Sequence, residues 1–413
     1  MTSVDTDNQE TFSDDKLVQR FALAAIDYSI NGLNNWRVDG CECCWGSDQV
    51  VCNPSGEVIQ ILGGGESLSG SIPVAIGLLT SIEVVFLHDN QLNGPIPSEV
   101  GVLTALSVWD LDRNQLSGTI PTEVGGLTRL EALILWENSL TGAIPSELGG
   151  LMALAFLGLH DNALTGMIPS EVGILTALSS LDVNGNAFAG TIPTEVGNLS
   201  ALTRFSLYNN ALTGMIPTQV GSLTALEGLW LYNNALTGTI PPQIGGLRAL
   251  TSLSISNNLL TGRIPTQVGS LTRLTHLSLF ENALTGTIPP QIGDLKGLEV
   301  LGLEANLLAG RIPTQVGGLT ALTWLSLRDN QLTGTIPSEV GGLTALRVLY
   351  LHNNALTGSI PTEVGGLTAL TSFWLSNNQL TGTMPTGVCE VVSPAIDCGE
   401  IVCDCCGCCG CSR

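Results

Sequence analysis

The feature that most constrains the fold of this chain is a sequence unit that recurs every 24 residues. Two positions of the unit keep this step without insertion: a proline, from Pro73 to Pro385, and an asparagine. A period of this size predicts a solenoid, in which each unit packs on its neighbours to bury a shared core. The recurring asparagines are Asn90, Asn114, Asn138, Asn162, Asn186, Asn210, Asn234, Asn258, Asn282, Asn306, Asn330, Asn354 and Asn378.

The unit reads L-x-x-L-x-x-L-x-L-x-x-N-x-L-x-G-x-I-P-x-x-V-G-x. The L-x-L before the asparagine alternates as a short strand does, so both leucines should point inward. The asparagine amide can satisfy buried backbone groups at the turn, so the asparagines should form a structural ladder. Glycine then supplies a tight bend, Ile-Pro begins an extended stretch, and V-G-x-L-T-A-L suits a short helical turn. The expected fold is an α/β solenoid with one parallel sheet and one continuous core.

The motif L-x-x-L-x-L-x-x-N resembles the leucine-rich repeat, and L-T-G-x-I-P resembles its plant-type subclass. The resemblance covers roughly residues 53–388. It implies a right-handed superhelix with a parallel sheet on its concave side. Similar family members are receptor ectodomains and secreted inhibitors that bind peptides, small hormones or enzymes. We expect a disordered N-terminus at 1–12, a helical, Cys-containing cap at 13–57, about 13–14 repeats at 58–388 and a Cys-rich cap or tail at 389–413.

The N-terminal cap should begin with a helix. Ser13 suits the N-cap position, and Asp14 and Asp15 place negative charge in the first turn. The residues that fall on one face of this helix are Leu17, Phe21, Ala24, Ala25 and Tyr28. The following W-R-V-D-G-C-E-C-C-W resembles the N-terminal cap of plant-type repeats.

All 12 cysteines lie at the two ends of the chain, which favours disulfides that close the solenoid in an oxidising compartment. A metal–thiolate cluster and reversible acylation are the alternatives for the tail, which resembles the endings of algal leucine-rich repeat proteins. We expect an extracellular or cell-surface protein whose export signal was removed or lies upstream, since residues 1–15 lack an apolar signal core. The disulfide candidates are Cys41, Cys43, Cys44, Cys52, Cys389, Cys398, Cys403, Cys405, Cys406, Cys408, Cys409 and Cys411.

The charge balance argues against a nucleic-acid partner. The chain has 14 Lys and Arg against 36 Asp and Glu, a net charge of −22, so it offers no basic footprint for phosphates. No run of 18 apolar residues is present, and no membrane span is expected within the chain.

The aromatic residues are concentrated on one face of the predicted sheet. We call this the outward strand face and define it by the positions two, four and six residues before each repeat asparagine. Between residues 53 and 388, four of 14 aromatics, Trp109, Phe188, Phe205 and Phe373, take inward leucine positions. The other ten, and all four histidines, lie on the outward strand face. Strands favour aromatic residues in general, but an exposed aromatic surface also marks binding sites.

The outward strand face is therefore the predicted ligand-binding site. Its residues form three groups along the chain. The N-terminal group is Phe86, His88, Asp110, Asp112, Trp136, Phe156, His160 and Asp182. The central group is Arg204, Tyr208, Trp230, Tyr232, His276 and Phe280. The C-terminal group is Trp324, Arg328, Tyr350, His352 and Trp374.

The sequence predicts a non-enzymatic, receptor-like or secreted recognition module for a peptide, protein or glycan, with a signalling co-receptor as a further partner. The alternatives are a secreted enzyme inhibitor and a protein that binds a cell surface or ice. His88, Asp112 and His160 share one column and could hold a metal or an acid–base pair, although Trp136 interrupts the row. Because no catalytic motif accompanies them, the sequence predicts no catalytic residue, no metal and no cofactor.

Overall fold

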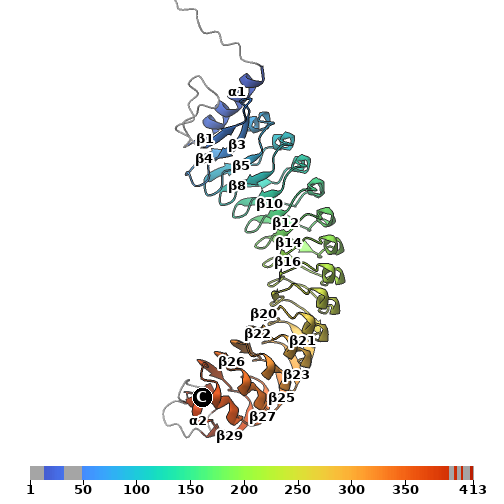
Figure 1. Ribbon diagram of the computed structural model, residues 1–413, viewed down its shortest axis with the longest axis vertical. Helices are drawn as coiled ribbons and strands as arrows, with labels where there is room; N and C mark the ends of the chain where they lie inside the picture. The colour runs from blue at the N-terminus through green and yellow to red at the C-terminus, as the bar shows by residue number, and fades with distance from the viewer. Residues whose placement is uncertain (1–13, 32–48, 390–394, 398–400, 403–409, 413) are drawn as a thin grey trace, which may run out of the picture. The chain divides into compact units, whose positions relative to one another are not determined.

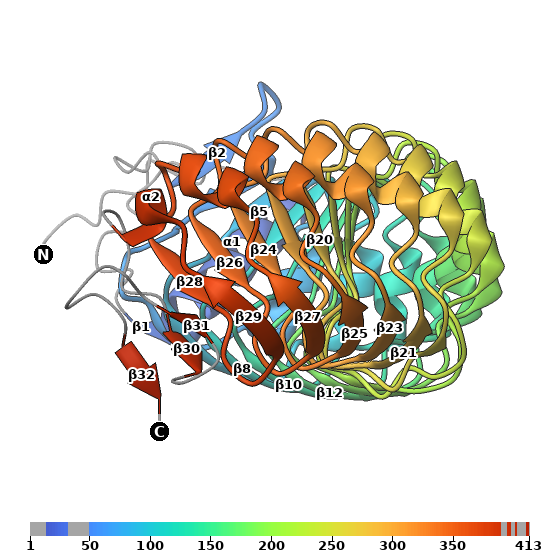
Figure 2. The same ribbon diagram turned by 90° about the horizontal axis from the view of Figure 1, so that it is seen from below.

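The computed structural model of the protein describes residues 14–31, 49–389, 395–397, 401–402 and 410–412. The chain divides into two compact units, Met1–Leu178 and Ser179–Arg413. Within each unit, a repeat places a short strand on one side and a 3-10 helix on the other (Figures 1 and 2). The fold is the predicted α/β leucine-rich repeat solenoid.

The strand before each repeat asparagine joins a parallel ladder that pairs identical positions of neighbouring repeats, and further strands continue the ladder before the first and after the last of these repeats. Phe205 lies beside Leu229, and Leu229 lies beside Leu253. In the first unit the strands are β3 (Val58–Leu62), β5 (Val84–Phe86), β7 (Val108–Asp110), β9 (Ala132–Ile134) and β11 (Phe156–Gly158). In the second they are β13 (Ser180–Asp182), β15 (Arg204–Ser206), β17 (Gly228–Trp230), β18 (Ser252–Ser254), β20 (His276–Ser278), β22 (Val300–Gly302), β24 (Trp324–Ser326), β26 (Val348–Tyr350), β28 (Ser372–Trp374), β30 (Ala395–Asp397) and β32 (Gly410–Ser412).

A second parallel ladder follows the asparagines, and the sequence did not predict it. A glycine with positive φ, such as Gly334 at 77°, ends most of its strands. The first unit contributes β4 (Ser69–Ser71), β6 (Gln91–Gly94), β8 (Gln115–Thr119), β10 (Ser139–Gly142) and β12 (Ala163–Gly166). The second contributes β14 (Ala187–Gly190), β16 (Ala211–Leu212), β19 (Thr261–Gly262), β21 (Ala283–Gly286), β23 (Leu307–Gly310), β25 (Gln331–Gly334), β27 (Ala355–Ser359), β29 (Gln379–Thr383) and β31 (Ile401–Val402).

The helical turns begin earlier in the unit than V-G-x-L-T-A-L predicted. Each is a five-residue 3-10 helix that starts directly after the proline of Ile-Pro, whose fixed φ suits that position. They are η1 (Val74–Leu78), η2 (Ser98–Val102), η3 (Thr122–Gly126), η4 (Ser146–Gly150) and η5 (Ser170–Ile174) in the first unit. In the second unit they are η6 (Thr194–Asn198), η7 (Thr218–Ser222), η8 (Pro242–Gly246), η9 (Thr266–Ser270), η10 (Pro290–Asp294), η11 (Thr314–Gly318), η12 (Ser338–Gly342) and η13 (Thr362–Gly366), followed by helix α2 (Thr386–Cys389).

Leucines and ring side chains in inward positions form the core of both units. Leu229 and Leu231 are fully buried, as are most equivalent leucines. Trp109, Phe188, Phe205 and Phe373 are also buried, as their places in leucine positions predict.

The repeat asparagines bridge neighbouring repeats through both ends of the amide. Asn258 Oδ1 accepts a hydrogen bond of 2.9 Å from the backbone N–H of Leu236, in the preceding repeat. Its Nδ2 donates to three carbonyl oxygens, those of Leu231, Ile255 and Ser256, at 3.0–3.2 Å. The same pattern recurs at other asparagines, for example Asn114. One side chain therefore satisfies backbone groups of two repeats.

The residue before most repeat asparagines has a left-handed backbone conformation. Ala305, with φ of 51°, is the least suited of them, because its Cβ crowds the following carbonyl in this region. We predict that Ala305→Gly raises the free energy of unfolding by about 0.5–1 kcal/mol. The control is Ala211→Gly, at an exposed position outside this conformation, which should lower stability. Urea unfolding of the two variants checks the sign, and a loss of stability in both would contradict the prediction.

The N-terminal helix is present but buries a different face from the predicted one. Helix α1 (Asp14–Ser29) is followed by β1 (Ile30–Asn31), which pairs antiparallel with β4. The buried residues of the helix are Ala22, Leu23 and Ile26, whereas Ala24 and the large residues of the predicted face are exposed. The helix has apolar residues on two sides, so the position of the first repeat decides which side is covered.

The cysteine predictions fall largely outside the described residues. Cys52 ends β2 (Val50–Cys52), which pairs antiparallel with β3, and is disulfide-bonded. The backbone of Cys389 and Cys411 lies in α2 and β32. The disordered segment predicted at 1–12 lies outside the described residues, as do Cys41, Cys43, Cys44, Cys398, Cys403, Cys405, Cys406, Cys408 and Cys409.

Candidate ligand-binding face

The outward strand face carries rings because leucines and aromatics alternate along the strands. In β17 and the residues that follow it, Leu229 and Leu231 are fully buried, while Trp230 and Tyr232 are half-buried. Successive side chains leave a strand on opposite sides, so the rings face away from the core. The same arrangement holds in both units, and each unit has its own set of ring contacts.

In the first unit, four of the five predicted rings form two separate pairs. The ring centroids of Trp136 and His160 are 4.3 Å apart with a tilt of 57°. The guanidinium carbon of Arg113 lies 4.8 Å from the Trp136 ring, which adds a cation–π contact. Phe86 meets His88 edge-on at 6.3 Å. The structure thus places His160 with Trp136 and His88 with Phe86.

Two acidic residues of the first unit are held where their charged forms are disfavoured. Burial raises the pKa of Asp110 to about 6 and also raises the pKa of Asp112, which is only 5% exposed. Because the folded pKa exceeds the unfolded one, ionising Asp110 lowers stability as pH rises from the unfolded value of 3.8 through about 6. Carboxyl groups whose ionisation lowers stability in this way are concentrated at functional sites.

The central group of the second unit contains a flat stack of two tyrosines. The rings of Tyr208 and Tyr232 lie 4.3 Å apart and within 9° of parallel. Burial, together with the neighbouring Tyr208, raises the pKa of Tyr232 to about 12. The Tyr232 phenol therefore stays neutral at physiological pH, and the stack offers a flat aromatic platform.

Trp230 is fixed beside this stack by three neighbours. Its Nε1–H donates a 3.1 Å hydrogen bond to Ser252 Oγ, and the guanidinium carbon of Arg204 lies 5.1 Å from its ring. The ring lies over Gly228, where an added Cβ would come within 1.9 Å of a ring carbon. Only glycine leaves room for this orientation.

The other residues predicted for the central group, and Asp182, have different contacts. Asp182, which the sequence grouped with the N-terminal residues, belongs to the second unit and is buried. It accepts a 2.9 Å hydrogen bond from Ser180 Oγ and lies 3.9 Å from Arg204 Nε, so it orients Arg204. His276 is exposed and hydrogen-bonded to Thr275, and Phe280 is half-buried. Within the described part of this unit, neither ring packs against the tyrosine stack.

The C-terminal group forms the largest ring cluster of the second unit. The centroid of Tyr350 lies 5.5 Å from Trp324, 5.8 Å from His352 and 5.2 Å from Trp374. His352 is itself 5.3 Å from Trp374. Trp324 is 38% exposed and Trp374 is 44% exposed. We call Trp324, Tyr350, His352 and Trp374 the four-ring cluster.

Polar contacts hold the four-ring cluster in place. Tyr350 Oη accepts a 3.2 Å hydrogen bond from Ser372 Oγ. Burial lowers the pKa of His352, so its imidazole is neutral at physiological pH. Arg328 forms a 2.5 Å ion pair with Asp329 beside the rings. The cluster therefore presents two exposed indoles on a preorganised, weakly charged support.

Glycines at outward positions leave the space in which several rings lie, and the sequence pattern did not predict this role. An added Cβ at Gly158 would lie 2.8 Å from the Phe156 ring, and one at Gly64 would lie 2.4 Å from His88 Nε2. At Gly302 the nearest ring atom, from Phe280, is 3.5 Å away. A glycine at an outward position that carries a larger side chain in most other repeats is the sequence signal that could have indicated this role.

Two family profiles described as leucine-rich repeats match the chain, one at residues 129–151, 225–247, 249–271 and 273–295 and the other at 320–380. A solved leucine-rich repeat protein of Leptospira interrogans is 32% identical, with 80% of each chain covered and a TM-score of 0.63. This chain belongs to the leucine-rich repeat family.

Plant receptors are also similar to this leucine-rich repeat protein. The plant peptide hormone receptor RGFR1, solved in complex with RGF2, is 36% identical over 83% of this chain, with a TM-score of 0.76. The Arabidopsis receptor kinase HAESA, solved with the peptide hormone IDA and the co-receptor SERK1, is 27% identical over 95% of this chain, with a TM-score of 0.65. The chain spans 59% of the RGFR1 chain and 78% of the HAESA chain. No curated protein sequence matches it.

These likenesses identify the repeats as plant-type and the fold as one typical of recognition proteins. Among the described residues of the leucine-rich repeat protein, every helix is too short or too polar to cross a bilayer.

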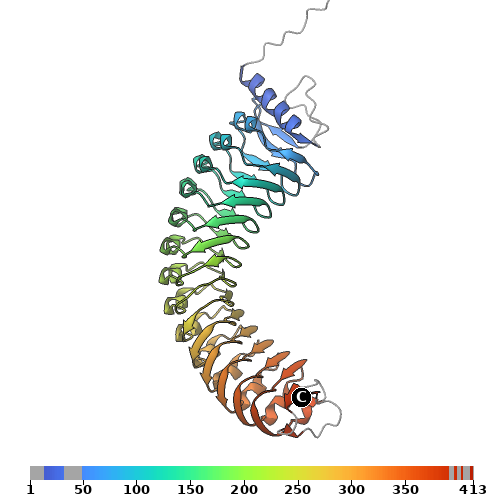
Figure 3. The same cartoon turned by 180° about the vertical axis from the view of Figure 1, so that it is seen from behind.

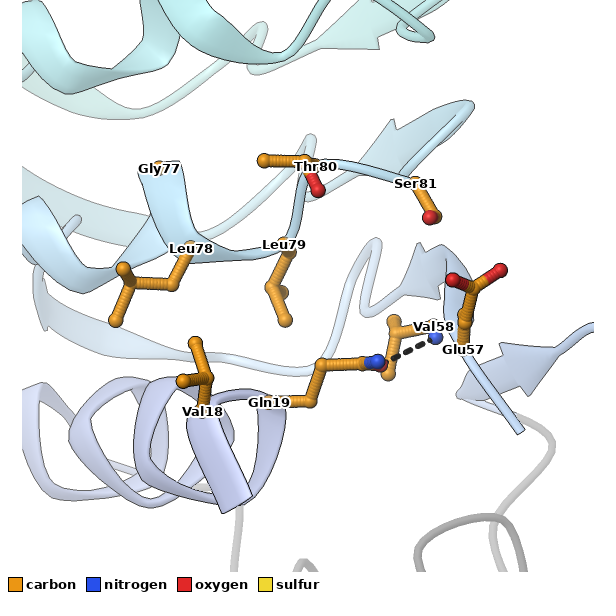
Figure 4. Close-up of a pocket in the computed structure, with 9 residues that line it drawn as sticks. All are labelled: Val18, Gln19, Glu57, Val58, Gly77, Leu78, Leu79, Thr80 and Ser81. Carbon is orange, nitrogen blue, oxygen red and sulfur yellow. Dashed lines mark hydrogen bonds between the residues drawn. The ribbon is translucent and has the colours of Figure 1, made fainter. Parts of the chain in front are cut away.

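A pocket of about 240 Å³ lies away from the outward strand face, between α1 and the first repeat (Figure 4). The Gln19 side chain extends from α1 toward the first repeat, and its Oε1 accepts a 2.8 Å hydrogen bond from the backbone N–H of Val58. Glu57, the titratable residue of the lining, accepts a hydrogen bond from Asn53. This pocket is a packing gap between the N-terminal helix and the first repeat. The ring clusters are therefore the stronger candidate site.

Proposed function

We propose that this leucine-rich repeat protein is a non-enzymatic recognition module that binds an extended peptide or protein segment through the four-ring cluster. The observation that carries the proposal is the exposure of Trp324 and Trp374 around Tyr350. Indole and phenol rings dominate binding hot spots because they bury large areas with few rotatable bonds. Preorganised rings reduce the entropy cost of docking.

The solved relatives support a peptide as the ligand. RGFR1 was solved with RGF2, and HAESA was solved with the peptide hormone IDA and the co-receptor SERK1. By analogy, this chain would bind a peptide outside the cell or at its surface, and a second receptor chain would be a further partner. The disulfide at Cys52 favours an oxidising compartment.

The central group extends the proposed binding surface within the same unit. Tyr208, Tyr232 and Trp230 form a second uncharged ring platform, with Arg204 beside it. An extended ligand that engages both platforms would use the tyrosine stack for flat contact and the exposed indoles as anchors. The weak charge of both platforms suits a peptide better than a polyanion.

A random-peptide display library panned on the immobilised full chain tests the proposal. For selected peptides, Trp324→Ala and Trp374→Ala should each weaken binding about 30-fold, because a hot-spot ring contributes about 2 kcal/mol. The matched control is Leu259→Ala with Leu307→Ala, which removes exposed apolar side chains of the same unit away from the rings.

The outcome that would overturn the proposal is selection of peptides whose binding neither tryptophan variant weakens. The double variant Trp230→Ala with Tyr232→Ala separates the two platforms. A loss confined to this double variant would move the site to the tyrosine stack, and the four-ring proposal would then be wrong.

A further inference from the structure

A histidine and two acidic residues converge in the first unit, whereas the residues of the proposed peptide site belong to the second unit. His88, Asp89 and Asp112 each offer one ligand atom, and these atoms all lie within 4.8 Å of one another. His88 and Asp89 follow β5, and Asp112 occupies the position of His88 one repeat later. The sequence had placed His160 with His88 and Asp112, but the His160 ring packs on Trp136.

One carboxylate oxygen of Asp112 lacks a hydrogen-bond partner within the described part of the chain. The residue is 5% exposed, and its Oδ1 is buried without a hydrogen-bond partner among the described residues. Its backbone N–H donates to Asp110 Oδ1, so a second carboxyl group lies close by. A buried carboxylate oxygen without a hydrogen-bond partner is costly, and a bound cation would lower that cost.

The orientation of His88 leaves one ring nitrogen turned toward the acids. Its Nδ1 lies 3.1 Å from Asp89 Oδ2. Its Nε2 lies against Gly64, where an added Cβ would be 2.4 Å away. The lack of a side chain at Gly64 therefore leaves space for the His88 ring. Nδ1 is the nitrogen placed to bind an ion together with the carboxylates.

We propose that His88 Nδ1, Asp89 and Asp112 form a binding site for a divalent transition-metal ion. Imidazole and carboxylate together suit such ions. Binding through Nδ1 requires the neutral imidazole tautomer whose proton is on Nε2, so that Nδ1 offers its lone pair to the ion. Asp89 would give up its 3.4 Å contact with Arg113, whose 3.5 Å contact with Glu137 and cation–π contact with Trp136 would remain. Three protein ligands leave coordination positions open for water or an acidic group of a partner.

The chain contains a natural comparison for this site. The tripeptide His-Asp-Asn occurs at 88–90 and again at 160–162. One repeat after each histidine, the first copy has Asp112 and the second has Asn184. The second copy thus lacks the buried acid, and its residues supply matched control variants.

Mn²⁺ binding to the full chain, followed by electron paramagnetic resonance, tests the proposal. Mn²⁺ prefers oxygen and nitrogen ligands, so the thiols of the Cys-rich tail should not compete. We expect one Mn²⁺ per chain, displaced by Zn²⁺. His88→Ala and Asp112→Asn should each weaken binding at least about tenfold, whereas His160→Ala and Asp161→Asn should leave it unchanged.

If Asp112→Asn does not fold, the exposed Asp89→Asn provides the same test. The absence of a bound Mn²⁺, or equal effects of the variants at 88–89 and 160–161, would overturn the proposal.

Discussion

Replacing Gly221 with alanine is expected to lower the free energy of unfolding by about 2–3 kcal/mol. A Cβ at this position would lie 2.3 Å from the carbonyl oxygen of Gln243 and 2.8 Å from its carbonyl carbon, in the next repeat. Both atoms belong to the backbone, so no side-chain rotation can relieve the overlap. Neighbouring 3-10 helices would have to move apart, and the leucines beneath them would lose packing. Urea unfolding of the full chain measures the loss.

Gly366→Ala is the matched control for this prediction. Gly366 closes η13, and an added Cβ there would meet no atom within 4 Å. Its unfolding free energy should stay within about 0.5 kcal/mol of the parent. Equal losses in both variants would show that glycine flexibility, and not the close approach of the repeats, sets the effect.

The repeat pattern predicted the core position by position. Phe205 occupies a leucine position and is fully buried, as the alternation requires. The pattern did not predict which side of α1 is covered, because Leu17 and Phe21 are as apolar as Leu23 and Ile26. That choice depends on the first repeat, which lies far away in sequence. The second strand ladder was also missed, since its strands contain too few apolar residues to show a period.

Alternation also predicted which rings leave the core, but it could not predict how they lie. The Trp230 ring lies over position 228 because that residue is a glycine. Asp112 and His352 are buried by neighbours from other repeats. Asp89 and Arg113 precede repeat asparagines in a left-handed conformation, outside the strand alternation. A strand pattern assigns no direction to such residues, so their contacts with His88 and Trp136 emerge only from the structure.

Asn258→Ala should lower the free energy of unfolding by about 2–3 kcal/mol, because it leaves several buried backbone groups unpaired. The N–H of Leu236 would lose its 2.9 Å acceptor, and the carbonyls of Leu231, Ile255 and Ser256 would each lose a donor. Asn93→Ala, at an exposed position in β6, should change stability by no more than about 0.5 kcal/mol.

Hydrogen exchange distinguishes this local loss from general destabilisation. Repeats in a solenoid interact with their nearest neighbours, so the damage should be concentrated near the missing side chain. In Asn258→Ala, the Leu236 amide should exchange faster, because its acceptor is gone. The Leu332 amide, which donates to Asn354 Oδ1, should change far less. Equal acceleration at Leu236 and Leu332 would mean that the asparagines stabilise the array as a whole, and the bridging role assigned to Asn258 would be wrong.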